Sequence, residues 1–238
     1  MNRFSNRYRL QDALRLVSLL GLLLGMTACD ATTVFLAKFE SDTVGSPPAP
    51  AQATGTVKID EGGGSVRVVD PPLATLPQNK WVRIRHQAAP SPETGMHCRF
   101  TGPSGLGKYS LLASLYIPGD AGVVNVNFET DQLGGNFVHF LHLDFMTEGD
   151  VRVDDGPVRF GHFPRNQAFE LSVNLDITAN KATAQIALLG GAASGSKKVT
   201  VNPTFLAPAK VFNTVQFGIG FQHKGSFFVD EILVTRQN

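Results

Sequence analysis

Residues 168–177 read Ala-Phe-Glu-Leu-Ser-Val-Asn-Leu-Asp-Ile, with polar and apolar side chains alternating throughout. Successive side chains of a β-strand point to opposite faces of the sheet, so the apolar residues of this stretch would share one face. Residues 123–130 alternate in the same way. One dry face and one wet face are typical of antiparallel sheets packed in two layers. The pattern predicts an all-β fold, a two-sheet antiparallel sandwich.

Short runs of β-branched and aromatic residues recur along the rest of the chain between clusters of Gly, Pro, Asn and Asp. This spacing favours a sandwich or barrel. With 42% hydrophobic and 17% charged residues, the chain has enough apolar material for one core, so we expect a single domain over residues 33–238. The predicted strands are 33–39, 56–60, 65–70, 80–86, 109–117, 123–130, 137–145, 150–154, 168–177, 182–189, 197–201, 214–221 and 226–236.

The N-terminus has the pattern of a secretion signal. Four arginines precede an apolar run at 16–26, and two small residues then lead to Cys29. A helix needs about 20 residues to cross a membrane, so this run is too short to stay there. It predicts a signal peptide over 1–28. Small residues directly before a cysteine resemble the lipobox of bacterial lipoproteins, which implies palmitate-type acylation of Cys29 and a tether over 29–32. The alternative is an ordinary signal peptide with an incidental cysteine.

The lipoprotein resemblance implies a domain held by its N-terminal lipid at a membrane of the bacterial cell envelope, on the periplasmic side. Asp30 resembles the inner-membrane retention signal of enterobacterial lipoproteins, and the outer membrane is the alternative. Four of the 21 Lys and Arg residues and one of the 20 Asp and Glu residues precede Cys29, so the mature chain would carry a net charge of −2. Without a run of like charges, this excludes nucleic acid as the expected partner.

Two residues with reactive side chains are predicted to be structural. If Cys29 is lipidated, Cys98 has no partner for a disulfide, and no Cys–His signature surrounds it. A small residue buried in the core is the favoured interpretation of Cys98, with a nucleophile as the alternative. His139 alternates with apolar residues and is predicted to be a core histidine rather than a ligand.

Three short segments resemble the concanavalin A-like lectin and glucanase superfamily, including its laminin-G-like members. They are residues 39–48 (Phe-Glu-Ser-Asp-Thr-Val-Gly-Ser-Pro-Pro), the strand pair around 150–155, and residues 227–234 (Phe-Phe-Val-Asp-Glu-Ile-Leu-Val). The resemblance covers nearly all of 33–236. It implies a jelly roll of two curved sheets in which the first and last strands pair.

Many sugar-binding jelly rolls hold calcium with acidic residues of the first and last strands, so the resemblance also implies a structural calcium ion. The residues in the corresponding places are Glu40, Asp42 and Asp230. The alternative is that these acidic residues only form turns at strand ends.

The strand predicted over 80–86 carries the first candidate ligand-binding group. Trp81, Arg83 and Arg85 would share one of its faces. An aromatic ring beside two guanidinium groups suits sugar recognition, because the ring stacks on a pyranose and the guanidinium groups donate to hydroxyls. The alternative is a tryptophan at the rim of the sandwich, covered by the arginine stems.

Polar rows on two further predicted strands form the second candidate group. On a concave sheet such rows would line a groove for a glycan, and an ordinary solvated face is the alternative. The residues are Asn125, Asn127 and Glu129 on one strand and His142 and Asp144 on the other.

The sequence shows no catalytic signature. It has neither the Glu-x-Asp-x-x-Glu strand of related glucanases nor a Gly-x-Ser-x-Gly elbow. The sequence therefore favours a non-catalytic, lipid-anchored envelope module that recognises a polysaccharide or glycoprotein on a concave sheet. One alternative is a structural lipoprotein that binds another envelope protein, and another is a divergent glycoside hydrolase or polysaccharide lyase.

Overall fold

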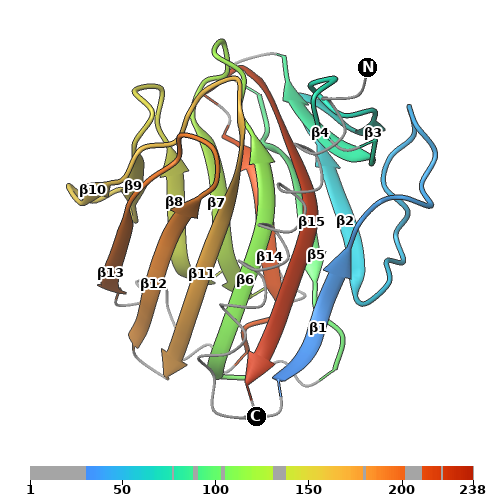
Figure 1. Cartoon of the computed structure of the whole chain (residues 1–238). Coiled ribbons are helices and arrows are strands. Elements are labelled where there is room, and N and C mark those ends of the chain that lie inside the picture. Colours follow the sequence, from blue (N-terminus) through green and yellow to red (C-terminus); the bar gives the residue numbers. More distant parts are fainter. Residues whose placement is uncertain are drawn as a thin grey trace, which may run out of the picture.

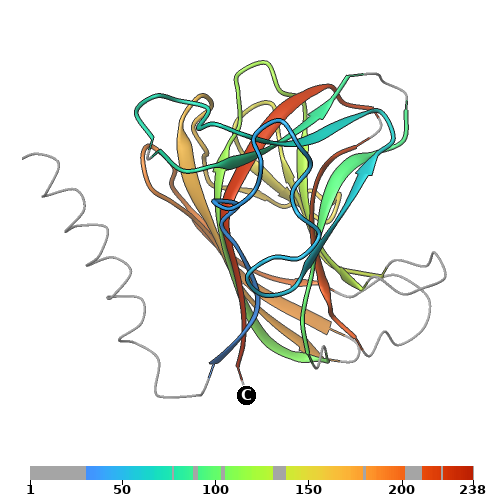
Figure 2. The same ribbon diagram turned by 90° about the vertical axis from the view of Figure 1, so that its right-hand side faces the viewer.

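The computed structural model describes residues 31–76, 78–87, 91–102, 105–130, 138–178, 181–201, 211–220 and 222–237. These residues form fifteen β-strands in two antiparallel sheets, and none of them is in a helix. Figure 1 looks onto one sheet, and Figure 2 shows the two layers from the side. The predicted two-sheet antiparallel sandwich is confirmed. Within the described ranges, no helix is long and apolar enough to span a membrane.

Eight strands form the first sheet and seven form the second. The eight-stranded sheet has the order β13 (Ser196–Val201), β12 (Lys181–Leu189), β11 (Ala168–Thr178), β6 (Gly107–Tyr116), β15 (Gly225–Gln237), β4 (Trp81–His86) and β3 (Gly64–Val69), and β1 (Ala31–Ala37) also pairs with β15. The seven-stranded sheet has the order β10 (Arg159–Phe160), β9 (Val151–Val153), β8 (Val138–Phe145), β7 (Val124–Thr130), β14 (Thr214–Ile219), β5 (Thr94–Arg99) and β2 (Thr56–Glu61).

The core lies between the apolar faces of the two sheets. In β11 every second residue from Phe169 to Ile177 is at most 2% exposed, as the alternation predicts. At one end of the core, the ring of Phe212 lies among other aromatic rings of both sheets and their loops. Burial of these side chains is the main favourable contribution to folding.

The last strand, β15, pairs with the first strand, β1. β15 is long enough to pair with β4 through Gly225–Val229 and with β1 through Ile232–Gln237, as Figure 1 shows. Between the two pairings Glu231 adopts a φ of 49°, and the register with β6 shifts. Such a bulge twists a strand and lets one strand serve two neighbours. The pairing of first and last strands that the resemblance implied is confirmed.

The predicted strands differ from the structure in two main places. β5 and the two-residue β10 were not predicted, although β5 lies between β14 and β2. The segment Thr94–Arg99 reads Thr-Gly-Met-His-Cys-Arg, and only Thr94 is β-branched, so it shows little local preference for a strand. Its place in the sheet comes from pairing on both sides.

The structure agrees with the prediction for Cys98 but not with the prediction for His139. Cys98 is fully buried in the core, which confirms its predicted structural place, and burial raises the pKa of its thiol. The prediction for His139 is wrong. Phe128 pairs with Leu141 and Glu129 with His139, so Phe140 is an extra residue in β8. This bulge turns His139 to the outward side, where its side chain is 36% exposed.

Candidate functional site

The outward face of the seven-stranded sheet is lined with polar side chains from adjacent strands. Across β5, β14, β7 and β8, the residues in register are His97, Gln216, Asn127 and His142. His97, Gln216 and Asn127 are at most 5% exposed, although they point away from the core. On the other sheet, the outward-facing Asn174 is exposed. These three side chains are therefore covered by their neighbours, and we call this surface the polar face. Its members are Glu93, His97, Asn125, Asn127, Glu129, His139, His142, Asp144 and Gln216.

One chain of contacts crosses the polar face from β2 to β8. His97 Nε2 lies 2.8 Å from Asp60 Oδ2, and His97 Nδ1 lies 3.2 Å from Glu129 Oε1. The other oxygen of Glu129 lies 3.5 Å from His139 Nε2. Two histidines thus hold the Glu129 carboxylate, which is 1% exposed. Because a buried charge needs such partners, this contact chain fixes the position of the carboxylate.

A second group of side chains on the polar face contains buried acceptor atoms without hydrogen-bond partners. Asn127 Nδ2 donates to Gln216 Oε1 at 2.7 Å, and the Gln216 side chain also hydrogen-bonds to Glu93. Among the described residues, Glu93 Oε1, Asn125 Oδ1 and Asn127 Oδ1 are buried without a hydrogen-bond partner. Unsatisfied buried acceptors are uncommon in folded proteins. Burial raises the pKa of Glu93, against the hydrogen bond from Gln216.

Two paired glycines form the floor beneath these acceptors. Gly218 of β14 pairs with Gly95 of β5, so neither strand covers the sheet with a side chain at this point. A Cβ placed on Gly218 would lie 2.5 Å from Glu93 Oε1 and 2.9 Å from Asn125 Oδ1. The Glu93 and Asn125 side chains therefore both lie over Gly218, and their unused oxygens come close to each other there. Both oxygens are acceptors for hydrogen bonds.

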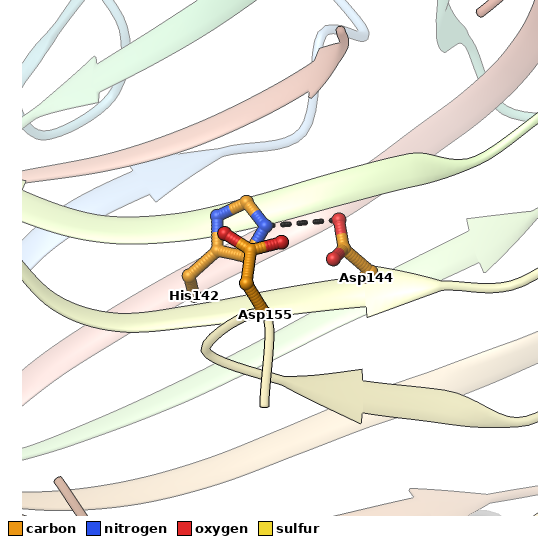
Figure 3. A group of neighbouring side chains, drawn as sticks. All are labelled: His142, Asp144 and Asp155. Carbon is orange, nitrogen blue, oxygen red and sulfur yellow. Dashed lines mark hydrogen bonds and ion pairs between the residues drawn. The ribbon is translucent and has the colours of Figure 1, made fainter. Parts of the chain in front are cut away.

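A third cluster contains His142, Asp144 and Asp155 (Figure 3). His142 and Asp144 extend from β8, and Asp155 comes from the turn after β9. His142 Nε2 lies 2.9 Å from Asp144 Oδ1. Arg152 Nη2 lies 2.6 Å from Asp144 Oδ2 and 2.9 Å from Asp155 Oδ1.

The ligand atoms of His142, Asp144 and Asp155 lie within 4.8 Å of one another, so they could in principle hold a metal ion. Calcium prefers six to eight oxygen ligands, whereas this set includes an imidazole. The Arg152 guanidinium already pairs with both carboxylates and supplies the positive charge between them. The cluster as it stands does not fit calcium.

The charges of this third cluster act on His142. Burial alone would lower its pKa, but the hydrogen bond to Asp144 and the charges of Asp144, Asp155 and Asp154 outweigh burial and raise it. A raised histidine pKa stabilises the fold fully below the unfolded value of 6.5, and this stabilisation is lost as pH rises through the folded value.

We expect Asp144→Asn to lower the pKa of His142, because the substitution removes the neighbouring negative charge and leaves burial as the larger effect. NMR titration of the imidazole Cε1 protons measures this pKa. The His139 imidazole is followed in the same spectra, because burial lowers its pKa and the charge of His142 also acts on it, so its titration is expected to respond to the change at His142. An unchanged His142 titration would show that Asp144 does not control it.

The two candidate ligand-binding groups lie on different sheets. Trp81, Arg83 and Arg85 belong to β4 of the eight-stranded sheet, whereas Asn125 to Glu129 and His142 to Asp144 belong to the seven-stranded sheet. The two groups therefore do not form one surface. Sequence alternation assigns faces within a strand but not the sheet to which the strand belongs.

Trp81 has a structural environment rather than an exposed one. Its side chain is 3% exposed, and Nε1 donates to Asn79 Oδ1 at 3.1 Å. A ring so deeply buried cannot stack on a sugar. The alternative of a tryptophan covered at the rim thus describes Trp81, while Arg83 is half-buried and Arg85 is exposed.

The residues proposed for calcium are also held by other contacts. Lys80 Nζ donates to the backbone oxygens of Glu40 and Asp42 at 2.7 and 2.6 Å. Asp42 Oδ2 accepts from Ala49 N at 3.0 Å. Glu40, Asp42 and Asp230 do not form a converging ligand set among the described residues. The ammonium group of Lys80 already binds the backbone oxygens of Glu40 and Asp42, so these residues do not fit a calcium ion as they stand. A calcium ion is therefore implied only by the resemblance.

Asp230 is a destabilising group at neutral pH. Its side chain is fully buried, Asn79 donates to Oδ2, and Oδ1 has no partner. Burial raises its pKa from 3.8 to about 7, and the charges of Glu231 and Glu40 add to this. The folded state therefore binds the proton more tightly, and stability falls as pH rises from about 4 to 7.

We expect Asp230→Asn to increase the free energy of unfolding at pH 8 by about 1–3 kcal/mol, because the amide has no charge to bury. At pH 4 the two proteins should be equally stable. Denaturant unfolding at both pH values tests this, with Asp176→Asn on the exposed face of β11 as the control. A gain at pH 4 as large as that at pH 8 would contradict the explanation.

Four residues of the polar face were missed in the sequence: Glu93, His97, His139 and Gln216. His97 belongs to the strand β5 that was not recognised, and Glu93 directly precedes it. Gln216 lies on the predicted strand 214–221, and its position between Val215 and Phe217 marks it as outward-facing. Local alternation is enough to assign Gln216 to the outward face, but it does not show that β5 and β7 are its neighbouring strands.

Comparison of the sequence with protein-family models gives no match, and neither does comparison with curated proteins. Solved structures are similar in fold. A carbohydrate esterase from Shiga toxin-encoding bacteriophage phi24B is 12% identical, with a TM-score of 0.54 over 87% of this chain and all of that chain. The catalytic domain of a glycoside hydrolase family 131 protein from Coprinopsis cinerea is 13% identical, with a TM-score of 0.51 over 87% of this chain and 97% of that one.

Lectin UEA-II complexed with galactose is 9% identical to this chain, with a TM-score of 0.50 over 89% of this chain and all of the lectin. At such identities the likeness concerns the fold alone. The fold is a jelly-roll sandwich of the concanavalin A-like type, as the resemblance implied.

Proposed function

We propose that the chain is a carbohydrate-binding module whose ligand lies on the polar face of the seven-stranded sheet. The observation that carries the proposal is the set of buried acceptors without partners, Glu93 Oε1, Asn125 Oδ1 and Asn127 Oδ1. Sugar hydroxyl groups are donors that can satisfy several acceptors arranged on one surface. These atoms are buried in the free protein, so the Glu93 and Asn125 side chains must turn outward for a sugar to supply the hydrogen bonds that they lack.

The paired glycines bring polar side chains to the middle of this face. Because Gly95 and Gly218 carry no side chains, Glu93 and Asn125 lie over Gly218 and are the groups that a ligand would meet there. The similar solved structures include a carbohydrate esterase and a lectin complexed with galactose, and their chemistry agrees with this proposal.

The N-terminal pattern places the module in the cell envelope in this proposal. Cys29 and Asp30 lie outside the described residues, and β1 begins at the next residue, Ala31. A lipid on Cys29 would therefore hold the sandwich close to the membrane surface. Mass spectrometry of the protein from its native membrane tests this, since acyl groups on an N-terminal Cys29 are expected. A mature protein that begins at another residue and carries no acyl group would contradict the lipid anchor.

A glycan array with the purified protein tests the carbohydrate proposal. We expect binding to at least one glycan, and Asn125→Ala should weaken it about tenfold by removing one acceptor. Asn174→Ala, on the outward face of the other sheet, should leave binding unchanged. Equal losses for both variants, or no glycan bound, would contradict the proposal. A stoichiometric protein partner in place of a glycan would favour an interaction lipoprotein.

Hydrolysis of a glycosidic bond is a second candidate function, favoured by one observation. Glu93 and Glu129 lie on the same face, and burial with the charge of Glu129 raises the pKa of Glu93. A carboxylic acid with a raised pKa near a second carboxylate is the arrangement that glycosidases use. Release of reducing sugar from a bound polysaccharide, lost in Glu93→Gln, would establish hydrolysis.

A further inference from the structure

A cavity of about 550 Å³ lies on the opposite side of the molecule from the polar face. It opens where β4 and the beginning of β15 meet the loop between β6 and β7. Its volume is within the range of small-molecule sites. The residues lining it include Arg83, Arg85, Gln87, Asp120, Ser226 and Phe228, together with the buried His86.

The two arginines in this cavity have no carboxylate partner among the described residues. Arg83 is half-buried, and its Nε is buried without a hydrogen-bond partner. Arg85 is exposed and forms no ion pair within the described ranges. By contrast, Arg67, which pairs with Arg83 across β3 and β4, forms an ion pair with Glu61. The cavity therefore holds guanidinium groups that are free to bind an anion.

An aromatic ring lies beside the arginines. Phe228 is in register with Arg83 and is half-buried. The ring of Tyr116 packs edge-on against it with centroids 5.6 Å apart, which holds the Phe228 ring in place. An aromatic face next to donor groups suits a pyranose ring, whose C–H face is apolar.

We propose that this cavity binds the acidic sugar units of a polysaccharide. The carboxylate of a uronic acid pairs with the guanidinium groups of Arg83 and Arg85, since guanidinium groups match carboxylates in two-point hydrogen bonds. The sugar ring lies against Phe228, and its hydroxyls reach Ser226, Gln87 and the exposed Asp120. This second site is on the sheet opposite the polar face and does not depend on the function proposed there.

Isothermal titration of the purified full-length protein with sodium glucuronate and with oligogalacturonate tests the proposal. Methyl glucoside is the neutral analogue, and inorganic phosphate and sulfate separate a sugar site from a bare anion site. We expect binding of the uronates that weakens at least tenfold in Arg85→Gln and in Arg83→Gln, and that weakens with salt. Arg67→Gln is the matched control on the same face and should bind as the unchanged protein does.

Arg85→Gln keeps the test decisive if Arg83→Gln does not fold, because the Arg85 side chain is exposed. Equal binding of methyl glucoside and glucuronate would overturn the proposal, and so would uronate binding that Arg85→Gln leaves unchanged. Binding of phosphate and sulfate without any uronate would also overturn it. Asn125→Ala separates the two sites, because it should weaken binding at the polar face and leave uronate binding here intact.

Discussion

The free energy of unfolding is expected to fall by about 3–5 kcal/mol when Phe212 is replaced by alanine. Phe212 is fully buried, and its ring centroid lies 5.0 Å from that of Phe100, 4.7 Å from that of Tyr109 and 5.7 Å from that of Phe140. The ring of Phe128 stacks near it at 6.3 Å. Removing the central ring leaves a cavity that the surrounding rings, held in both sheets, can fill only in part.

Denaturant unfolding of the full chain measures this loss. Val44→Ala is the control, because Val44 is 46% exposed and should change stability by no more than about 0.5 kcal/mol. A loss below about 1.5 kcal/mol for Phe212→Ala would mean that the aromatic cluster repacks around the missing ring.

The second large effect is on ligand binding. Gly218→Ala is expected to weaken glycan binding about a hundredfold, because its methyl group displaces the Glu93 and Asn125 side chains that carry the unpaired acceptors. Gly218 has an ordinary backbone conformation, since it is not among the residues with positive φ, so alanine fits the strand. The Cβ would meet Glu93 Oε1 at 2.5 Å, and this flexible carboxylate can move aside without unfolding the sheet.

Gly220→Ala is the matched control for this variant. Its Cβ would come no closer than 3.7 Å to Asn125 Nδ2 and 3.9 Å to His223 Cδ2, which are ordinary contacts. Affinities of both variants for the glycan found on the array, with thermal unfolding to check the fold, give the comparison. Glycan binding that survives Gly218→Ala would place the ligand away from Glu93 and Asn125, against the proposed site.

The strand β8 shows where sequence alternation is reliable and where it fails. From His142 to Phe145 the alternation holds, and His142 and Asp144 face outward as predicted. Just before this stretch, the extra residue Phe140 reverses the pattern, so His139 joins the polar face instead of the core. A bulge depends on the partner strand, which the local sequence does not contain.

The sequence by itself determined the layered β architecture, because a period of two assigns each side chain of an uninterrupted strand to the core or to the outside. It also determined the burial of most core residues, Cys98 included. Only the tertiary structure decided which outward-facing residues meet. Glu93, Asn125 and Gly218 lie far apart along the chain, and the first two meet over Gly218 only because β5, which Glu93 precedes, and β7 both pair with β14.

The same physical reason separates the two predicted ligand-binding groups. The outward alternation of Arg83 and Arg85 was readable, but the sheet that contains β4 depends on its pairing with β15, which is more than a hundred residues later in the chain. Strand pairing over such distances is set by the packing of the whole core, and no local pattern encodes it. Local sequence therefore assigned the faces of the strands, and long-range pairing assembled the sites.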